Sequence, residues 1–157
     1  MKKSKTREAY ALTEEEMQLV KKEAYKRFYN SEQYGERKAA NPGEMALRCI
    51  GEAVLCKAIG VEWGGALSAT LAGDFVVKAA KEHWHGLLIP VNSIIYDAVY
   101  VLVSPTYRNP MEYAVHWIDG ESVLANASKY LKKNGEVFII PQDKLFGVTK
   151  LREMFNG

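Results

Sequence analysis

The feature that most constrains the fold of this 157-residue chain is a run of five apolar residues, Val99-Tyr100-Val101-Leu102-Val103. Three of the five are β-branched valines and none is charged, which favours a β-strand. A strand with one solvated face alternates apolar and polar residues, whereas a continuous apolar run indicates burial on both faces. We therefore expect a central sheet with other elements packed on each side of it.

Two amphipathic helices are predicted before this strand. The first begins after Thr13, which forms a capping box with Glu16, and runs to about Ser31. The second opens on Asn41-Pro42-Gly43-Glu44, where Asn41 suits the N-cap, and it ends at Gly60. Its apolar surface is wider than a single stripe, so we expect it to pack on the sheet and to be partly covered on its other side.

The sequence after residue 61 consists of short β-rich runs separated by turn residues. Strands are expected at 66–70, 75–79, 87–91, 98–104, 112–118 and 137–140, and short helices near 120–126 and 149–155. The predicted class is α/β (α+β), with three layers in which a central mixed sheet is flanked by helices on both sides.

Length and composition limit the organisation of the chain. With 157 residues, 48% of them apolar and 25% charged, the chain fits one folded domain, and its longest apolar runs are well short of the roughly 18 residues that span a bilayer. We expect a basic, flexible tail over residues 1–10 and one domain over 11–157. No apolar core follows the first charges, so a cytoplasmic location without membrane contact is expected.

The two cysteines are predicted to be reduced core residues. Cys49 and Cys56 lie seven residues apart in the second predicted helix, so their Cα atoms would be about 10 Å apart. That separation exceeds the reach of a disulfide.

Six short motifs follow one another along the chain. They are Gly43-Glu44, Val77-Lys78, Leu87-Leu88-Ile89, Asp97-Ala98-Val99-Tyr100-Val101-Leu102-Val103, His116-Trp117-Ile118-Asp119-Gly120 and Pro141-Gln142-Asp143-Lys144-Leu145. In this order they resemble small phage and prophage proteins of the PD-(D/E)xK nuclease superfamily. The resemblance implies a restriction-endonuclease-like fold, magnesium or manganese as the cofactor of any active member, and the host cytoplasm as the location of a phage-encoded one.

The metal-binding motif of these nucleases is incomplete here. In the enzymes that this chain resembles, two carboxylates hold the metal, and a lysine two residues after the second carboxylate acts on water. Residues i and i+2 of a strand lie on one face about 6.6 Å apart. Lys78 matches the lysine, but Val76 stands where the second carboxylate belongs. Asp74 is about 13 Å from Lys78 along an extended strand, so only a bulge or a shifted strand start would bring it inward.

The remaining catalytic candidates are Glu44, Asp74 and Lys78, with Glu44 and Asp74 as the candidate metal ligands. Each has a structural alternative: Glu44 suits a capping box, Asp74 suits a turn or strand entry, and an inward Lys78 needs either a phosphate or an acidic partner. Two basic clusters could bind nucleic acid or simply be solvated. They comprise Lys2, Lys3, Lys5 and Arg7 in the tail, and Lys129, Lys132 and Lys133.

The three histidines of the chain are further candidates. His83 and His85 could bind zinc or manganese, but an exposed hairpin that presents Trp84 for stacking or for partner contact is the favoured interpretation. His116 is interpreted as a strand residue rather than a catalytic one.

Two main functions are open at this point. The favoured one is a catalytically degenerate nuclease-fold protein that binds nucleic acid or a host protein, with a counter-defence role as one form of the latter. The alternative is a metal-dependent DNA endonuclease that uses Glu44, Asp74 and Lys78. A third interpretation is a structural subunit, such as a homodimer, that assembles through Tyr10, Tyr25, Phe28 and Tyr29.

Overall fold

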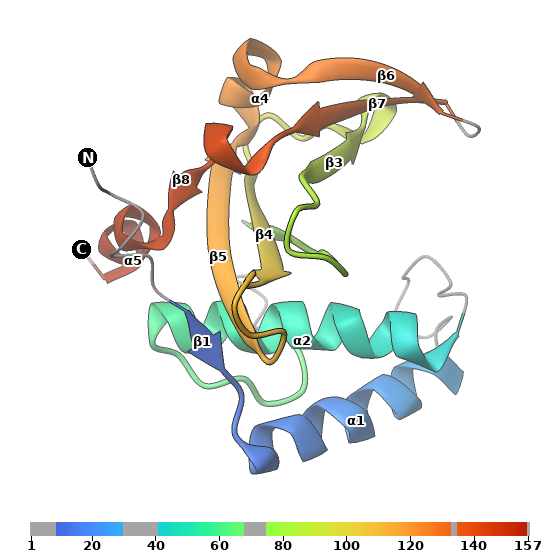
Figure 1. The fold of residues 1–157 in the computed structure, drawn as a ribbon, viewed down its shortest axis with the longest axis vertical. Coiled ribbons are helices and arrows are strands. Elements are labelled where there is room, and N and C mark those ends of the chain that lie inside the picture. Colours follow the sequence, from blue (N-terminus) through green and yellow to red (C-terminus); the bar gives the residue numbers. More distant parts are fainter. Residues whose placement is uncertain (1–8, 30–40, 68–74, 133–134, 157) are drawn as a thin grey trace.

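The computed structural model describes residues 9–29, 41–67, 75–132 and 135–156, which form a mixed α+β fold (Figure 1). The helices are α1 (Glu14–Tyr29), α2 (Pro42–Ile59), α4 (Gly120–Asn126) and α5 (Val148–Asn156), with short 3-10 turns at η3 (Val91–Ser93) and η4 (Gln142–Lys144). The strands are β1 (Tyr10–Ala11), β2 (Phe75–Ala79), β3 (Leu87–Pro90), β4 (Val99–Pro105), β5 (Glu112–Asp119), β6 (Ser128–Lys132), β7 (Gly135–Ile140) and β8 (Phe146–Gly147). No described helix is both long and apolar enough to cross a membrane.

The larger sheet is mixed, as predicted. Its strand order is β1-β5-β4-β2, with β8 also pairing with β5. Strand β2 runs parallel to β4, and β4 runs antiparallel to β5. Strand β4 therefore occupies an interior position between two long partners.

The prediction that β4 is buried on both faces is confirmed. Val101 and Val103 belong to the core beneath α1 and α2, whereas Tyr100 and Leu102 belong to a second core on the opposite face. All four residues are at most 2% exposed. The Tyr100 hydroxyl oxygen accepts a 2.8 Å hydrogen bond from the Ile95 backbone N–H, which satisfies the polar end of this buried ring.

The layer on that opposite face corrects the sequence prediction. A three-stranded sheet, β3-β7-β6, covers it together with the short helix α4, so helices do not form the whole layer (Figure 1). Leu87 and Ile89 of β3 are buried while Leu88 and Pro90 are exposed, the alternation of a strand with one solvated face. The fold is therefore helices, mixed sheet and second sheet in succession.

Both long helices begin as predicted. The Thr13 backbone N–H donates to Glu16 Oε1 at 2.7 Å, and the Glu16 N–H donates to Thr13 Oγ1 at 3.1 Å, which completes the capping box. Helix α2 starts at Asn41, whose side chain accepts from the Glu44 N–H at 2.9 Å. It ends at Gly60, whose φ of 82° is readily adopted by glycine.

A buried ion cluster joins the two helices. Arg27 is 2% exposed and makes two hydrogen bonds to the Glu52 carboxylate, at 2.8 and 3.0 Å. It also donates to the Gly65 carbonyl at 2.8 Å, and Trp63 Nε1 donates to Glu52 at 3.1 Å. Because a buried guanidinium is tolerated only when its donors are satisfied, this cluster fixes α1, α2 and the following loop relative to one another.

The structure describes the C-terminal helix, but it describes only the last two residues of the expected N-terminal tail. Residues 1–8 of the expected tail are outside the described residues, and Tyr10, which the prediction placed in the tail, pairs with Tyr113 in the sheet. At the other end, Arg152 of α5 donates to the Ala58 carbonyl of α2 at 3.0 Å and to the Tyr10 hydroxyl. The expected strand at 66–70 falls largely outside the described residues.

Both cysteines are free and buried, as predicted. Burial raises the pKa of the Cys56 thiol to about 11, and the neighbouring Glu52 carboxylate adds to the rise.

The raised pKa of Cys56 predicts a loss of stability at alkaline pH. An unfolded chain loses this proton near pH 9, so the contribution of the thiol is complete below that pH and is lost as the pH rises towards 11. Between those values the wild type should lose up to about 2 kcal/mol more unfolding free energy than Cys56→Ala. Urea unfolding over this range measures the difference, and two parallel pH profiles would contradict it.

Gly120 at the start of α4 should not tolerate a side chain. A Cβ at this position would lie 2.2 Å from the Ile95 carbonyl oxygen, so Gly120→Ala must displace backbone and should cost about 2–3 kcal/mol of unfolding free energy. Gly147→Ala is the matched control, since a Cβ there meets nothing within 4 Å, and it should change stability by less than about 0.5 kcal/mol. Equal urea midpoints for the two variants would refute this packing.

Candidate functional site

Lys78 lies on β2 with its neighbours set by strand register. It is paired with Leu102 of β4, and it shares a face with Val76, two residues earlier. Val76 packs against the core of the second sheet, so the position of the missing carboxylate is filled by apolar contacts. Lys78 is half-buried at the end of the same face.

Helix α2 brings Glu44 to this end of the strand. Gly51 of α2 lies so close to β2 that a Cβ on it would be 3.2 Å from the side chains of Val77 and Ala79. This tight approach fixes the helix against the face of β2 that carries Val77 and Ala79, which is opposite to the face of Lys78. Glu44 and Lys78 nevertheless line the same two adjoining hollows, of about 720 and 300 Å³. We refer to these together as the basic hollow.

The charges that line the basic hollow favour an anion. Of the residues that the structure describes, the charged ones lining it are Lys78, Lys81, Arg48 and Glu44. The Glu44 carboxylate is 3.4 Å from the Arg48 guanidinium, one helical turn away, so part of its charge is offset. Among the described lining residues, three cations outnumber the one paired carboxylate, so this part of the lining is positive, although the whole chain has a net charge of only +2.

A turn over residues 81–86 forms the rim of the basic hollow, and Gln142 holds it in place. The Gln142 side-chain amide donates to the His83 carbonyl at 2.7 Å and to the His85 carbonyl at 2.8 Å. Gly86 closes the turn against β7, where a Cβ would be 2.6 Å from the Ile140 carbonyl oxygen. Trp84 lines the hollow yet remains 68% exposed.

The histidines of this turn do not converge on a common point. His85 Nδ1 accepts from the Glu82 backbone N–H at 3.3 Å, and the His85 ring contacts Trp84 with centroids 4.4 Å apart. The His83 ring instead contacts Tyr107, with centroids 5.0 Å apart. Within the described ranges, no group of three or more His, Cys, Asp or Glu side chains is placed to hold a metal ion.

The described residues therefore do not fit the magnesium or manganese site of the nucleases that the chain resembles. Of the two candidate ligands, Asp74 lies outside the described residues, and among the described lining residues Glu44 alone carries a carboxylate, beside Arg48. Val76 offers no oxygen ligand, which these hard cations require.

The predicted basic clusters are only partly described. Lys2, Lys3, Lys5, Arg7 and Lys133 lie outside the described residues, as does the side chain of Lys132. Lys129 is exposed on β6, which belongs to the second sheet.

Three further candidates, His116, Tyr10 and Phe28, pack within the fold. His116 is a buried residue of β5, paired with Leu102 and Gly147, which agrees with its interpretation as a strand residue. The expected aromatic assembly surface is divided, because Tyr10 and Phe28 pack against the helical core. Tyr25 and Tyr29 are exposed, and their rings contact each other with centroids 4.7 Å apart.

Comparison with protein-family models, with curated proteins and with solved structures gives no match for this chain.

Four residues of the site and its rim had no role in the sequence interpretation: Arg48, Lys81, Gln142 and Tyr107. Gln142 was noted only as part of a motif, and the side chain of a glutamine after proline does not reveal which distant carbonyls it will contact. Tyr107 follows Pro105-Thr106 in a loop, where an exposed tyrosine is unremarkable. The only feature of the sequence that points to a binding role for Tyr107 is the arginine that follows it, Arg108.

Loss of Gln142 should loosen the rim of the basic hollow. Gln142→Ala removes both hydrogen bonds to the turn, so amide exchange at residues 81–86 should become at least about fivefold faster while global stability falls by about 1 kcal/mol. Gln18→Ala on the exposed face of α1 is the matched control. Hydrogen exchange read by mass spectrometry checks this, and unchanged exchange in the turn would show that Gln142 does not hold it.

Proposed function

We propose that this chain is a catalytically degenerate protein of the PD-(D/E)xK nuclease class, with a restriction-endonuclease-like core, which binds nucleic acid at the basic hollow without cutting it. One observation carries the proposal. Lys78 and Glu44 line the same hollow, whereas Val76, at the position of the second carboxylate, packs into an apolar core.

The chemistry of the lining separates binding from cleavage. Phosphodiester hydrolysis by such a site requires a metal that activates water and offsets developing charge, and the metal requires several oxygen ligands. Among the described lining residues the only carboxylate is Glu44, and the Arg48 guanidinium competes with a metal ion for it. Binding a phosphate needs only cations, and Lys78, Lys81 and Arg48 supply them.

The alternative function is metal-dependent endonuclease activity through Glu44, Asp74 and Lys78. The shared hollow of Glu44 and Lys78 favours it, because these two residues come from elements far apart in the sequence. It requires Asp74 to supply the second carboxylate from the strand entry. A host protein as the partner would use the same rim, with Trp84 as its anchor.

Removing the two lysines of the basic hollow should weaken nucleic-acid binding. Lys78→Ala combined with Lys81→Ala should lower affinity about tenfold and reduce the slope of log affinity against log salt by about two, because each lysine neutralises one phosphate charge. Fluorescence anisotropy with labelled DNA at several salt concentrations measures both changes. Lys21→Ala combined with Lys22→Ala is the control, since it removes the same charge from exposed positions of α1.

The same preparations distinguish binding from cleavage. Plasmid and single-stranded DNA incubated with the protein and either Mg²⁺ or Mn²⁺ should remain intact. Metal-dependent cutting that Lys78→Ala abolishes would replace the proposal with the endonuclease alternative. Equal affinity of the hollow variant and the α1 control would remove the basic hollow as the binding site.

A further inference from the structure

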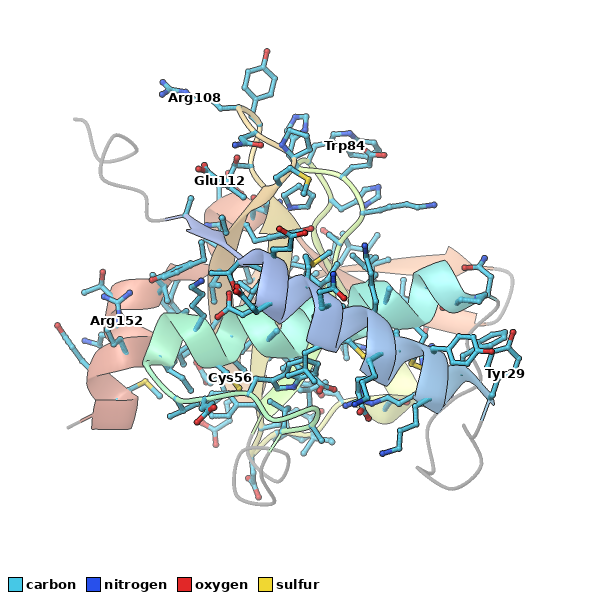
Figure 2. The ribbon with its side chains drawn as sticks, turned by 90° about the horizontal axis from the view of Figure 1, so that it is seen from below. Tyr29, Cys56, Trp84, Arg108, Glu112 and Arg152 are labelled. Atoms are coloured by element: carbon cyan, nitrogen blue, oxygen red, sulfur yellow. The ribbon has the colours of Figure 1, made fainter. Side chains whose placement is uncertain are left out.

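Two turns project together beside the basic hollow. One is the 81–86 turn, and the other is the loop between β4 and β5, which carries Tyr107 and Arg108. The contact between the His83 and Tyr107 rings joins them. Figure 2 shows Trp84 and Arg108 projecting at the same end of the molecule.

The rings at this end are exposed although they are large. Trp84 is 68% exposed and Tyr107 is 82% exposed. Each contacts a histidine ring edge-on, with interplanar angles of 72° for Trp84 and His85 and 66° for His83 and Tyr107. In an edge-on pair, one ring supports the other without covering both of its faces, so aromatic faces remain available to a flat ligand.

Side-chain hydrogen bonds hold both turns, so the backbone that carries Trp84 and Tyr107 is fixed. Gln142 holds the 81–86 turn. In the other loop, the Thr106 hydroxyl donates to the Asn109 carbonyl at 2.9 Å, and Asn109 Oδ1 accepts from the Met111 N–H at 2.9 Å. Preorganised aromatic side chains lose little entropy when they bind, which suits a binding surface rather than a collapsed core.

Cations stand beside these rings. Lys78 and Lys81 line the hollow together with the exposed Trp84, and Arg108 follows Tyr107 in the sequence. Exposed aromatic rings interleaved with cations match a strand whose bases are unstacked and whose phosphates run alongside. In a duplex the base faces are already stacked on one another and cannot reach Trp84.

We infer that the end of the molecule formed by Trp84, Tyr107 and the basic hollow is a stacking site for single-stranded nucleic acid, with bases on the two rings and phosphates on Lys78 and Lys81. The inference rests on the proposed function and narrows its ligand to unpaired strands. A duplex would meet the same cations without the stacking contribution.

The tryptophan content of the chain supplies a direct readout. Of the three tryptophans, Trp63 and Trp117 are buried and Trp84 is exposed. Iodide quenches the fluorescence of exposed tryptophans only, which here means Trp84. A base that stacks on Trp84 should therefore quench the same part of the tryptophan fluorescence. The probes are an oligo-dT and a duplex, each of about 12 nucleotides per strand, which lies within the site size of comparable surfaces.

Trp84→Ala should weaken oligo-dT binding by about 5- to 100-fold, the range for loss of one stacked base, while Trp84→Phe should stay within about threefold of wild type. Duplex affinity should change by less than about twofold in both variants, because it depends on the cations. Tyr25→Ala, an exposed tyrosine on α1, is the control and should leave oligo-dT binding unchanged.

Two results would overturn the inference, and they are distinguishable. If oligo-dT and duplex bind equally and Trp84→Ala affects neither, the stacking site is refuted while nucleic-acid binding at the basic hollow stands. If neither probe binds to the wild type at low salt, the proposed function fails together with the inference.

Discussion

The burial of β4 on both faces is the constraint on which the rest of the structure depends. A strand that is apolar throughout must be covered twice, and this chain covers it with helices on one side and a second sheet on the other. That arrangement places β2 beside β4 in parallel and fixes which of its residues face each layer. Val76 consequently faces the second sheet, and Lys78 follows it to the edge where the rim turn begins.

Three interactions hold the site in shape without taking part in ligand binding. Gly51 lets α2 lie close on β2, and Glu44 of this helix lines the same hollow as Lys78. Gln142, from η4 after the second sheet, holds the 81–86 turn by its carbonyls. The Arg27–Glu52 cluster holds α1 against α2. Because the 81–86 turn is held in this way, Trp84 is exposed to solvent and the cations of the basic hollow lie beneath it.

The sequence predicted most elements because their signals are local. The apolar run of β4, the capping box at Thr13 and the Asn41 cap each act within a few residues, and the structure confirms them. The two-residue strands β1 and β8 are too short to show any periodicity, and the polar strand β6 lacks an apolar face in its sequence. The second sheet was missed because strand partners are set by tertiary contacts. For the same reason, the proximity of Glu44 to Lys78 was only a hypothesis, and the pairing of His83 with Tyr107 was not foreseen.

The central claim is that unpaired bases stack at the end of the molecule that carries Trp84. Photocrosslinking of 5-bromodeoxyuridine-substituted single-stranded DNA, followed by mass spectrometric mapping of the attached peptide, tests it most directly. Crosslinks should concentrate on the peptide that contains residues 81–86, with a second site at Tyr107, and Mg²⁺ should leave the bound strand intact. Crosslinks confined to Tyr25 and Tyr29 of α1, or strand scission in Mg²⁺, would contradict this account.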